Sequence, residues 1–178
     1  MQISYTLIRS RRRTIALQIT GQGLVVRAPL KLSERVIREF VECKRPWVEQ
    51  QLAKLPPALP PFTQAELKAI KAQAAREIPP RVKILADQIG ITYGRISLRW
   101  QKTRWGSCSA KGNLNFNCLL MLAPPEVRDY VIIHELCHRK ELNHSPAFWK
   151  LVEQAMPEYK SCRHWLKYEG ILLIRRLP

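Results

Sequence analysis

One short segment of the chain combines the residue types of a hydrolytic metal site. It reads His134-Glu135-Leu136-Cys137-His138, and His144 follows six residues after it. Residues four apart lie on one face of a helix, so His134 and His138 can bind the same metal ion. Glu135 lies beside them and can accept a proton from a water molecule at that ion, and His144 can supply a third nitrogen. Because catalytic zinc sites keep an open fourth position, the pattern predicts a Zn²⁺ site of three histidines with Glu135 as general base.

Glu158 is an alternative third ligand. It follows His138 at a spacing seen in zinc peptidases that use a glutamate. His144 is favoured because a short turn directly behind the motif restricts its position, whereas Pro157 places Glu158 in the first turn of the last helix. In a competing interpretation the histidines are ordinary core residues, but polar side chains on a buried helix need partners, and a metal ion supplies one.

The flanking residues define the helix that carries the motif. Pro124 and Pro125 suit its first turn, and the nearly continuous apolar run 129–133 is typical of a buried helix. Asn143 tolerates a left-handed backbone conformation and is expected to turn the chain after the helix. Ser145 is expected to cap a further helix that begins near Pro146. His144 should therefore lie in a tight link between two helices.

Proline usage predicts how the chain is divided. The segment Pro56-Pro57-Ala58-Leu59-Pro60-Pro61 is typical of a stiff spacer. We therefore expect an N-terminal strand–helix subdomain (residues 1–55), a proline-rich spacer (56–62) and a larger domain that carries the metal motif (63–178). The first part should contain a hairpin of strands 14–19 and 24–27 around Gly21-Gln22-Gly23, followed by a helix capped by Ser33 and another that begins near Pro46.

The second part is expected to alternate helices and strands. Thr63 and Glu66 form a capping box for a helix that Pro79 and Pro80 should interrupt, with a second helical segment that ends at Gly90. Strands are predicted near 96–100, 104–108 and 114–119. The predicted fold class is α+β, with a small mixed or antiparallel sheet over the motif helix and the N-terminal hairpin and helix as an appendage.

Residues 104–108 allow two interpretations, which are compatible. As an edge strand above the metal they can pair with an extended substrate, and Gly106 would permit the close approach of another chain. As a structural hairpin they would place Trp105 in the core. Asn115 and Asn117 share a strand face and could orient the metal ligands.

Composition limits the classes of function. The 178 residues suit one domain or one domain with a small appendage. Five cysteines without a C-x-x-C pair indicate a reducing compartment. No signal peptide or membrane-length apolar run is seen, so a cytoplasmic location is expected. The net charge of +16 indicates either attraction to polyanions or simply a soluble surface.

Several motifs together resemble one known family. Arg104-Trp105-Gly106-Ser107-Cys108, Leu114-Asn115-Phe116-Asn117, the His134–His138 motif and Asn143-His144-Ser145 with Phe148-Trp149 are similar to the YgjP-like metallopeptidases, small zincins related to the SprT and WLM groups. The resemblance covers nearly the whole chain. It implies a zincin fold, a zinc ion held by His134, His138 and His144, and Glu135 as general base. It does not imply a substrate.

Three functions of different classes follow from these observations. The first is a zinc metallopeptidase that acts on peptides or proteins, including nucleic-acid-associated proteins. The second is a zinc hydrolase of a nucleotide or another phosphorylated small molecule, which the positive charge would suit. The third is a basic nucleic-acid-binding protein with a non-catalytic metal site. No membrane partner is expected. The sequence does not indicate the oligomeric state.

Overall fold

The structure is a computed structural model that describes residues 3–20, 23–53 and 59–178. The chain divides into two compact units, Met1–Ala58 and Leu59–Pro178. The predicted hairpin turn at Gly21-Gln22 and the first part of the predicted spacer, Pro56-Pro57-Ala58, lie outside the described residues. Among the described residues, no helix has both the length and the apolar character needed to cross a membrane.

The N-terminal unit contains a three-stranded sheet and two helices. The elements are β1 (Tyr5–Ser10), β2 (Ala16–Thr20), β3 (Gly23–Pro29), α1 (Glu34–Cys43) and α2 (Arg45–Ala53). The predicted hairpin is confirmed, because β2 pairs antiparallel with β3. A further strand, β1, pairs parallel with the other side of β3 and gives the order β1-β3-β2. Alternate residues of β3 are buried against α1 and α2 in a separate core, which comprises Leu24, Val26, Ala28, Ile37, Val41 and Val48.

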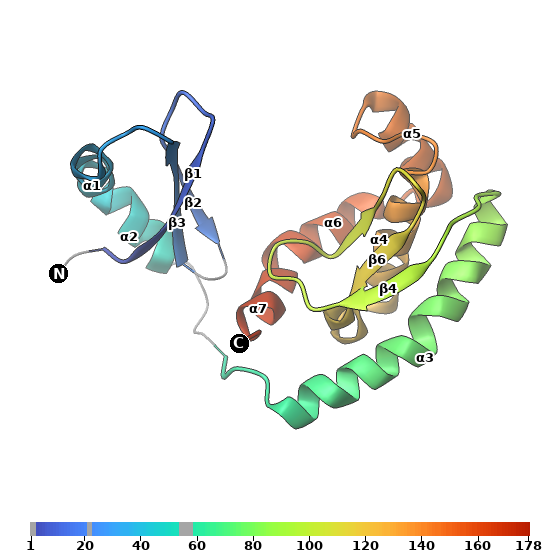
Figure 1. The fold of residues 1–178 in the computed structure, drawn as a ribbon. Coiled ribbons are helices and arrows are strands. Elements are labelled where there is room, and N and C mark those ends of the chain that lie inside the picture. The colour runs from blue at the N-terminus through green and yellow to red at the C-terminus, as the bar shows by residue number, and fades with distance from the viewer. Residues whose placement is uncertain (1–2, 21–22, 54–58) are drawn as a thin grey trace. The chain divides into compact units, whose positions relative to one another are not determined.

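The C-terminal unit carries the motif. Its elements are α3 (Gln64–Ile89), β4 (Ile96–Arg99), β5 (Gly106–Cys108), β6 (Leu114–Asn117), the 3-10 helix η1 (Cys118–Leu122), α4 (Pro125–Cys137), α5 (Pro146–Ala155), α6 (Tyr159–Tyr168) and α7 (Gly170–Arg175). The sheet has the order β4-β6-β5, with β4 parallel and β5 antiparallel to β6. The mixed sheets and the helices confirm the expected α+β class (Figure 1).

The predicted break at Pro79 and Pro80 is wrong. Helix α3 runs without interruption from the capping box at Thr63 to a left-handed Gly90 at its C-terminus, and both prolines lie inside it. Its buried stripe continues across the prolines, through Ile78 and Val82, which are both fully buried. A proline in a helix costs about 3 kcal/mol. Burying each large side chain of the stripe returns about 1.5–3 kcal/mol, so tertiary packing outweighs the local preference.

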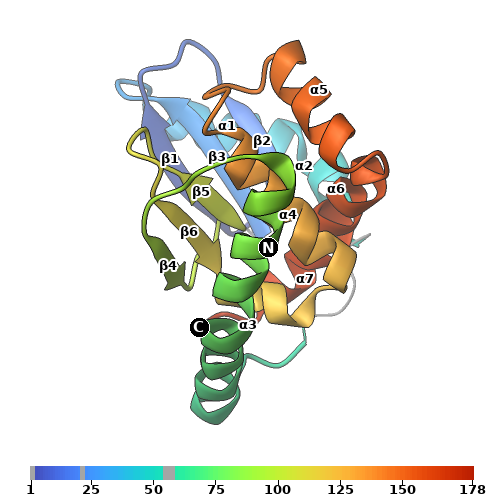
Figure 2. The ribbon, with the colours of Figure 1, turned by 90° about the vertical axis from the view of Figure 1, so that its right-hand side faces the viewer.

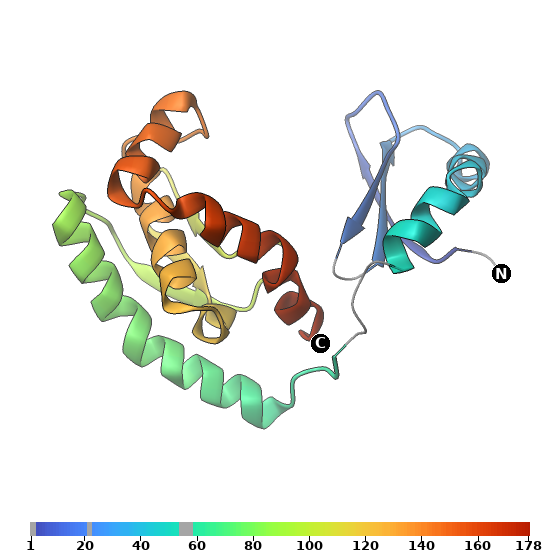
Figure 3. The same ribbon diagram turned by 180° about the vertical axis from the view of Figure 1, so that it is seen from behind.

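Helix α4 is surrounded on several sides, as its apolar sequence predicted. It lies between the β4-β6-β5 sheet and α6, with α3 packed along it (Figure 2). Figure 3 shows α6 and α7 on the side of α4 that faces away from the sheet. Two ion pairs tie α3 to α4: Arg81 Nε donates to Asp129 Oδ1 at 2.8 Å, and Arg128 donates to Glu77 at 2.8 Å. These contacts fix the N-terminal half of α4 against α3.

Candidate metal centre and active site

Three histidines converge at the C-terminal end of α4. His134 is in the last turn of the helix, His138 is its C-terminal cap, and His144 is in the link to α5. One nitrogen from each lies within 4.8 Å of the other two, and Nε2 of His134 is 3.0 Å from Nε2 of His144. Tetrahedral zinc with Zn–N bonds of about 2.0 Å requires nitrogen separations of about 3.3 Å. This donor set therefore fits a zinc-sized ion.

Neighbouring groups orient the imidazole rings. Nδ1 of His138 lies 2.9 Å from the backbone oxygen of Glu141, which leaves its Nε2 free for the centre of the group. The Phe148 ring packs against all three imidazoles, with centroids 4.4–4.9 Å apart. Trp149 stacks on His144 at 5.6 Å and 25°. Backbone and aromatic contacts of this kind hold metal-binding imidazoles in one orientation.

The link that carries His144 differs from the prediction in one respect. No non-glycine residue among those described has a positive φ, so the expected left-handed conformation of Asn143 is wrong. Asn143 instead turns the chain with its side chain, since its Oδ1 accepts a hydrogen bond from the Ser145 backbone at 3.2 Å. Ser145 caps α5 as predicted, accepting a hydrogen bond from the Phe148 backbone. Local side-chain bonds thus turn His144 back toward α4.

The alternative ligand Glu158 does not join this group. It is exposed at the N-terminus of α6 and is not one of the clustered residues. His164, the fourth histidine of the chain, is exposed and contacts the Tyr168 ring at 4.3 Å. The structure therefore brings His134, His138 and His144 together and leaves Glu158 and His164 outside.

Glu135 lies beside the histidines in a small cavity. Its side chain is buried, with only 6% of the residue exposed. The cavity has a volume of about 240 Å³, and it is lined by Arg104, Trp105, Gly106, Tyr130, Val131, His134, Glu135 and Leu166. A Cβ atom placed on Gly106 would lie 2.7 Å from both Cγ and Oε1 of Glu135. The glycine in β5 therefore makes room for the carboxyl group rather than for a second chain.

Burial shifts the pKa of both polar residues at the start of the motif. It raises the pKa of Glu135 to about 8, and the positive charge of Arg104 acts in the opposite direction. Burial, followed by the charges of His138, His144 and Arg163, lowers the pKa of His134 to about 3. His134 is consequently neutral at physiological pH, which is the form in which an imidazole binds a metal ion. Shifts of this size in neighbouring residues are typical of functional sites.

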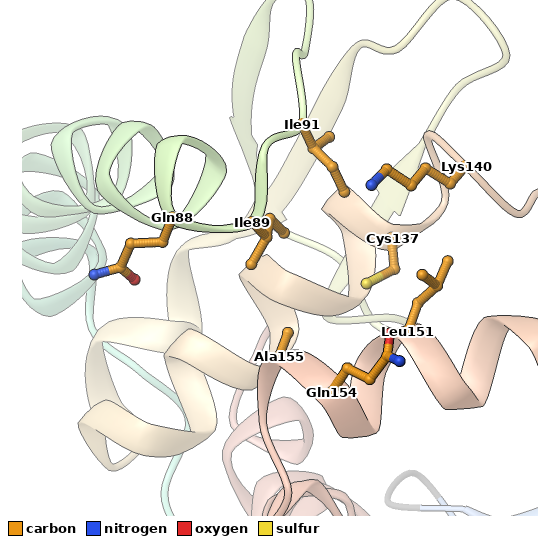
Figure 4. Close-up of a pocket in the computed structure, with 8 residues that line it drawn as sticks. All are labelled: Gln88, Ile89, Ile91, Cys137, Lys140, Leu151, Gln154 and Ala155. Carbon is orange, nitrogen blue, oxygen red and sulfur yellow. The ribbon is translucent and has the colours of Figure 1, made fainter.

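The opposite face of α4 carries no part of this site. Cys137 points away from the imidazoles, as predicted, into a second cavity of about 250 Å³ (Figure 4). Ile89 at the end of α3, Ile91 just after that helix and Leu151 on α5 form its apolar walls, and Lys140 also lines it. Burial raises the pKa of the Cys137 thiol to about 11. This cysteine is a buried apolar residue and has the properties of neither a ligand nor a nucleophile.

Two roles within the β5 and β6 segment differ from those predicted. Asn117, proposed to orient metal ligands, is fully buried and donates from Nδ2 to the backbone oxygens of Gln101 and Arg104. Asn115 donates to the Ser107 hydroxyl. Both asparagines therefore fasten the strand that carries Gly106. Arg104, which lines the cavity, was not singled out from the sequence; its place in the RWGSC motif is the only signal that pointed to it.

Comparison with known proteins gives three related results. A UTP pyrophosphatase of Escherichia coli (strain K12) is 28% identical over 111 residues, which are 61% of this chain and 64% of that protein. The metallopeptidase zymogens abylysin of Pyrococcus abyssi and jannalysin of Methanocaldococcus jannaschii are 26% and 22% identical. Each covers 51% of this chain and 93% of its own, with a TM-score of 0.45.

A family match extends over most of the molecule. Residues 13–70 and 63–169 match the family described as YgjP-like, metallopeptidase domain. These segments cover most of both units and every residue of the histidine cluster and of the cavity around Glu135. The resemblance that the sequence motifs suggested is confirmed, and the chain belongs to the YgjP-like metallopeptidase family, a family of metal-dependent hydrolases.

Proposed function

We propose that this protein is a zinc-dependent peptidase that hydrolyses an amide bond with water. The observation that carries the proposal is the convergence of three imidazoles beside a buried carboxyl group, Glu135, which shares a cavity with one of them, His134. Membership of a metallopeptidase family supports the same reaction class. Structural zinc sites have four protein ligands, whereas three nitrogens leave one position for water or substrate.

Each residue of the cluster has a separate role in this proposal. His134, His138 and His144 hold the ion, and Glu135 is the general base. Bound zinc lowers the pKa of a water molecule and polarises the substrate carbonyl group. Glu135 accepts the proton of the attacking water and passes it to the leaving nitrogen. The walls around Glu135, including Trp105 and Leu166, reduce the access of bulk water to this proton transfer.

The sheet beside the cavity suits an extended peptide. β5 is at the edge of the β4-β6-β5 sheet, so its outer backbone groups are available to pair with another strand. The cavity of about 240 Å³ is smaller than the 300–1,000 Å³ that is typical of pockets enclosing a small molecule. A substrate that lies across the strand and inserts one group fits these dimensions better than one that must be enclosed.

Hydrolysis of a peptide panel tests the proposal. The zinc-loaded protein should cleave casein or fluorogenic peptides, and a chelator should abolish the activity. Glu135→Gln is the matched variant, because the amide keeps the shape of the side chain and loses its basicity. We expect it to retain zinc and to lose at least about a hundredfold in kcat, the lower end of the contribution of general base catalysis. Equal rates for the variant and the wild type would refute the role of Glu135.

Hydrolysis of a nucleoside triphosphate is the second candidate. It is favoured by one observation, the similarity to a protein named UTP pyrophosphatase, although the match spans 64% of that relative. The same cluster could activate water for attack on a phosphoryl group. Chelator-sensitive release of pyrophosphate from UTP, without cleavage of any peptide, would select this candidate. Salt-sensitive DNA binding with neither activity would contradict both hydrolase proposals.

A further inference from the structure

We propose that Arg104 and Arg163 select substrates that carry a negatively charged group, a carboxylate or a phosphate, close to the bond that is cut. This inference rests on the proposed function, since it names the substrate class of the same site. It does not depend on whether the bond is an amide or a phosphoanhydride. One experiment can therefore support the peptidase proposal and contradict the selection of anionic substrates, or the reverse.

Other arginines around the motif helix are neutralised. Arg128 pairs with Glu77 at 2.8 Å, and Arg81 pairs with Asp129. Arg139 is occupied differently, because its Nε donates to the backbone oxygen of Thr92. Within residues 3–20, 23–53 and 59–178, no carboxylate lies within 4.0 Å of Arg104 or Arg163. These two exposed guanidinium groups are therefore available to an external anion.

Arg163 is held against the imidazole side of the site. Its Cζ lies 4.6 Å from the centroid of the Trp149 ring. Trp149 in turn stacks on His144 and, at 5.5 Å and 19°, on Tyr159. The guanidinium group is thus positioned on an aromatic side chain that contacts one of the three candidate ligands.

Arg104 is held on the side of the general base. Its backbone oxygen accepts a hydrogen bond from Asn117 Nδ2 at 3.1 Å, and the Asn117 backbone donates to the neighbouring Trp105 oxygen at 2.8 Å. The start of the strand is therefore fixed to β6. The side chain lines the cavity together with Glu135 and His134. The two arginines consequently approach the cluster from different elements, the β5 segment and α6.

This arrangement favours anions for a simple electrostatic reason. A divalent ion at the histidines would have one unpaired guanidinium group on each side, and Glu135 is the single carboxyl group among the residues that line the cavity. A neutral substrate gains little from either arginine, whereas a carboxylate or phosphate can accept bidentate hydrogen bonds from each. Hydrogen bonds to charged groups contribute a factor of about ten or more to binding. We therefore expect each arginine to discriminate between charged and neutral substrates by about tenfold.

Matched peptides test this inference in the zinc-loaded, full-length chain. The substrates are pairs of fluorogenic peptides that differ only by Glu or Gln on one side of the cleaved bond, and UTP serves as the phosphate source. The variants are Arg104→Gln and Arg163→Gln. Arg99→Gln is the control, because Arg99 is an exposed arginine on β4, at the opposite edge of the same sheet. Binding is measured separately by calorimetry with Glu135→Gln protein, which retains the arginines.

The expected result is selective loss. For each site variant, kcat/KM should fall about tenfold with the acidic peptides and change little with the neutral ones. Arg99→Gln should leave kcat/KM unchanged for both kinds of peptide. If wild-type protein cleaves neutral and acidic peptides equally, or if the site variants slow both equally, the inference is overturned while the peptidase proposal stands. If only UTP is cleaved and the site variants raise its KM about tenfold, the inference holds and the peptidase proposal fails. Equal affinity of the Glu135→Gln protein for both peptides of a pair would also overturn the inference.

Discussion

Gly106→Ala is expected to damage catalysis without disturbing metal binding. The added Cβ would lie 2.7 Å from Cγ and from Oε1 of Glu135. Carbon atoms in favourable contact are about 3.5 Å apart. Glu135 must therefore move by about 0.8 Å. The backbone itself accepts alanine, because Gly106 is not among the glycines with positive φ.

The carboxyl group has little room in which to move. Glu135 is 6% exposed and lies on α4, which is buried on several sides. A displacement of about 1 Å in a catalytic group can reduce the rate by about a hundredfold. We therefore expect kcat to fall by about that factor in a fluorogenic peptide assay. Zinc content should stay at the wild-type level, because the three atoms nearest to the new methyl group all belong to Glu135.

Gly90→Ala is the matched control. Gly90 ends α3 with a φ of 64°, and an added Cβ would have no atom within 4 Å. Alanine in this left-handed conformation should lower the free energy of unfolding by about 1 kcal/mol and leave kcat unchanged. If zinc-loaded Gly106→Ala protein works at more than a third of the wild-type rate, the close approach of Gly106 and Glu135 does not position the base. A crystal structure of the variant with Glu135 unmoved would lead to the same conclusion.

Three further predictions concern the metal and the ionisable groups. His144→Ala should lose tightly bound zinc in elemental analysis, whereas Glu158→Ala should keep it; the reverse result would assign the third ligand to Glu158. Chelation should lower the melting temperature, because a ligand at a thousand times its Kd stabilises the folded state by about 4 kcal/mol, and an unchanged temperature would mean that no tight site exists. In metal-free protein, urea titrations should show stability falling as the pH rises from 6.5 to about 8 and again as it drops below 4.5. Glu135→Gln should remove the loss of stability above pH 6.5, and His134→Gln should remove the loss below pH 4.5. Stability profiles that these variants leave unchanged would contradict the assigned pKa shifts.

Local geometry explains which features of the site were predictable. The separation of His134 and His138 follows from helical periodicity alone, because four residues complete about one turn. The caps at Ser33, Thr63 and Ser145 are equally local, since each side chain bonds to a backbone group three residues away. Such features need no information from distant parts of the chain.

The features that were missed depend on contacts between distant segments. Pro79 and Pro80 stop a helix only when little is gained by continuing it, and the burial of Ile78 and Val82 by other elements could not be read from α3 itself. All of β6 and η1 and most of α4 lie between Gly106 and Glu135 in the chain, so the role of Gly106 appears only when β5 packs on the motif helix. The same packing brings Arg104 to the cavity.

The two buried ionisable groups of the motif oppose one another in the metal-free protein. The pKa of Glu135 is raised from 4.5 to about 8, so between these values folding requires the uptake of a proton and stability falls as the pH rises. The pKa of His134 is lowered from 6.5 to about 3, so folding requires the release of a proton and stability falls as the pH drops.

Between pH 4.5 and 6.5 the two slopes, each at most about 1.4 kcal/mol per pH unit, largely cancel. Outside that window each residue destabilises the fold by itself, and each could be replaced by an apolar residue of similar size. A pair of neighbouring side chains that both lose solvation on folding is best explained by the chemistry they perform together.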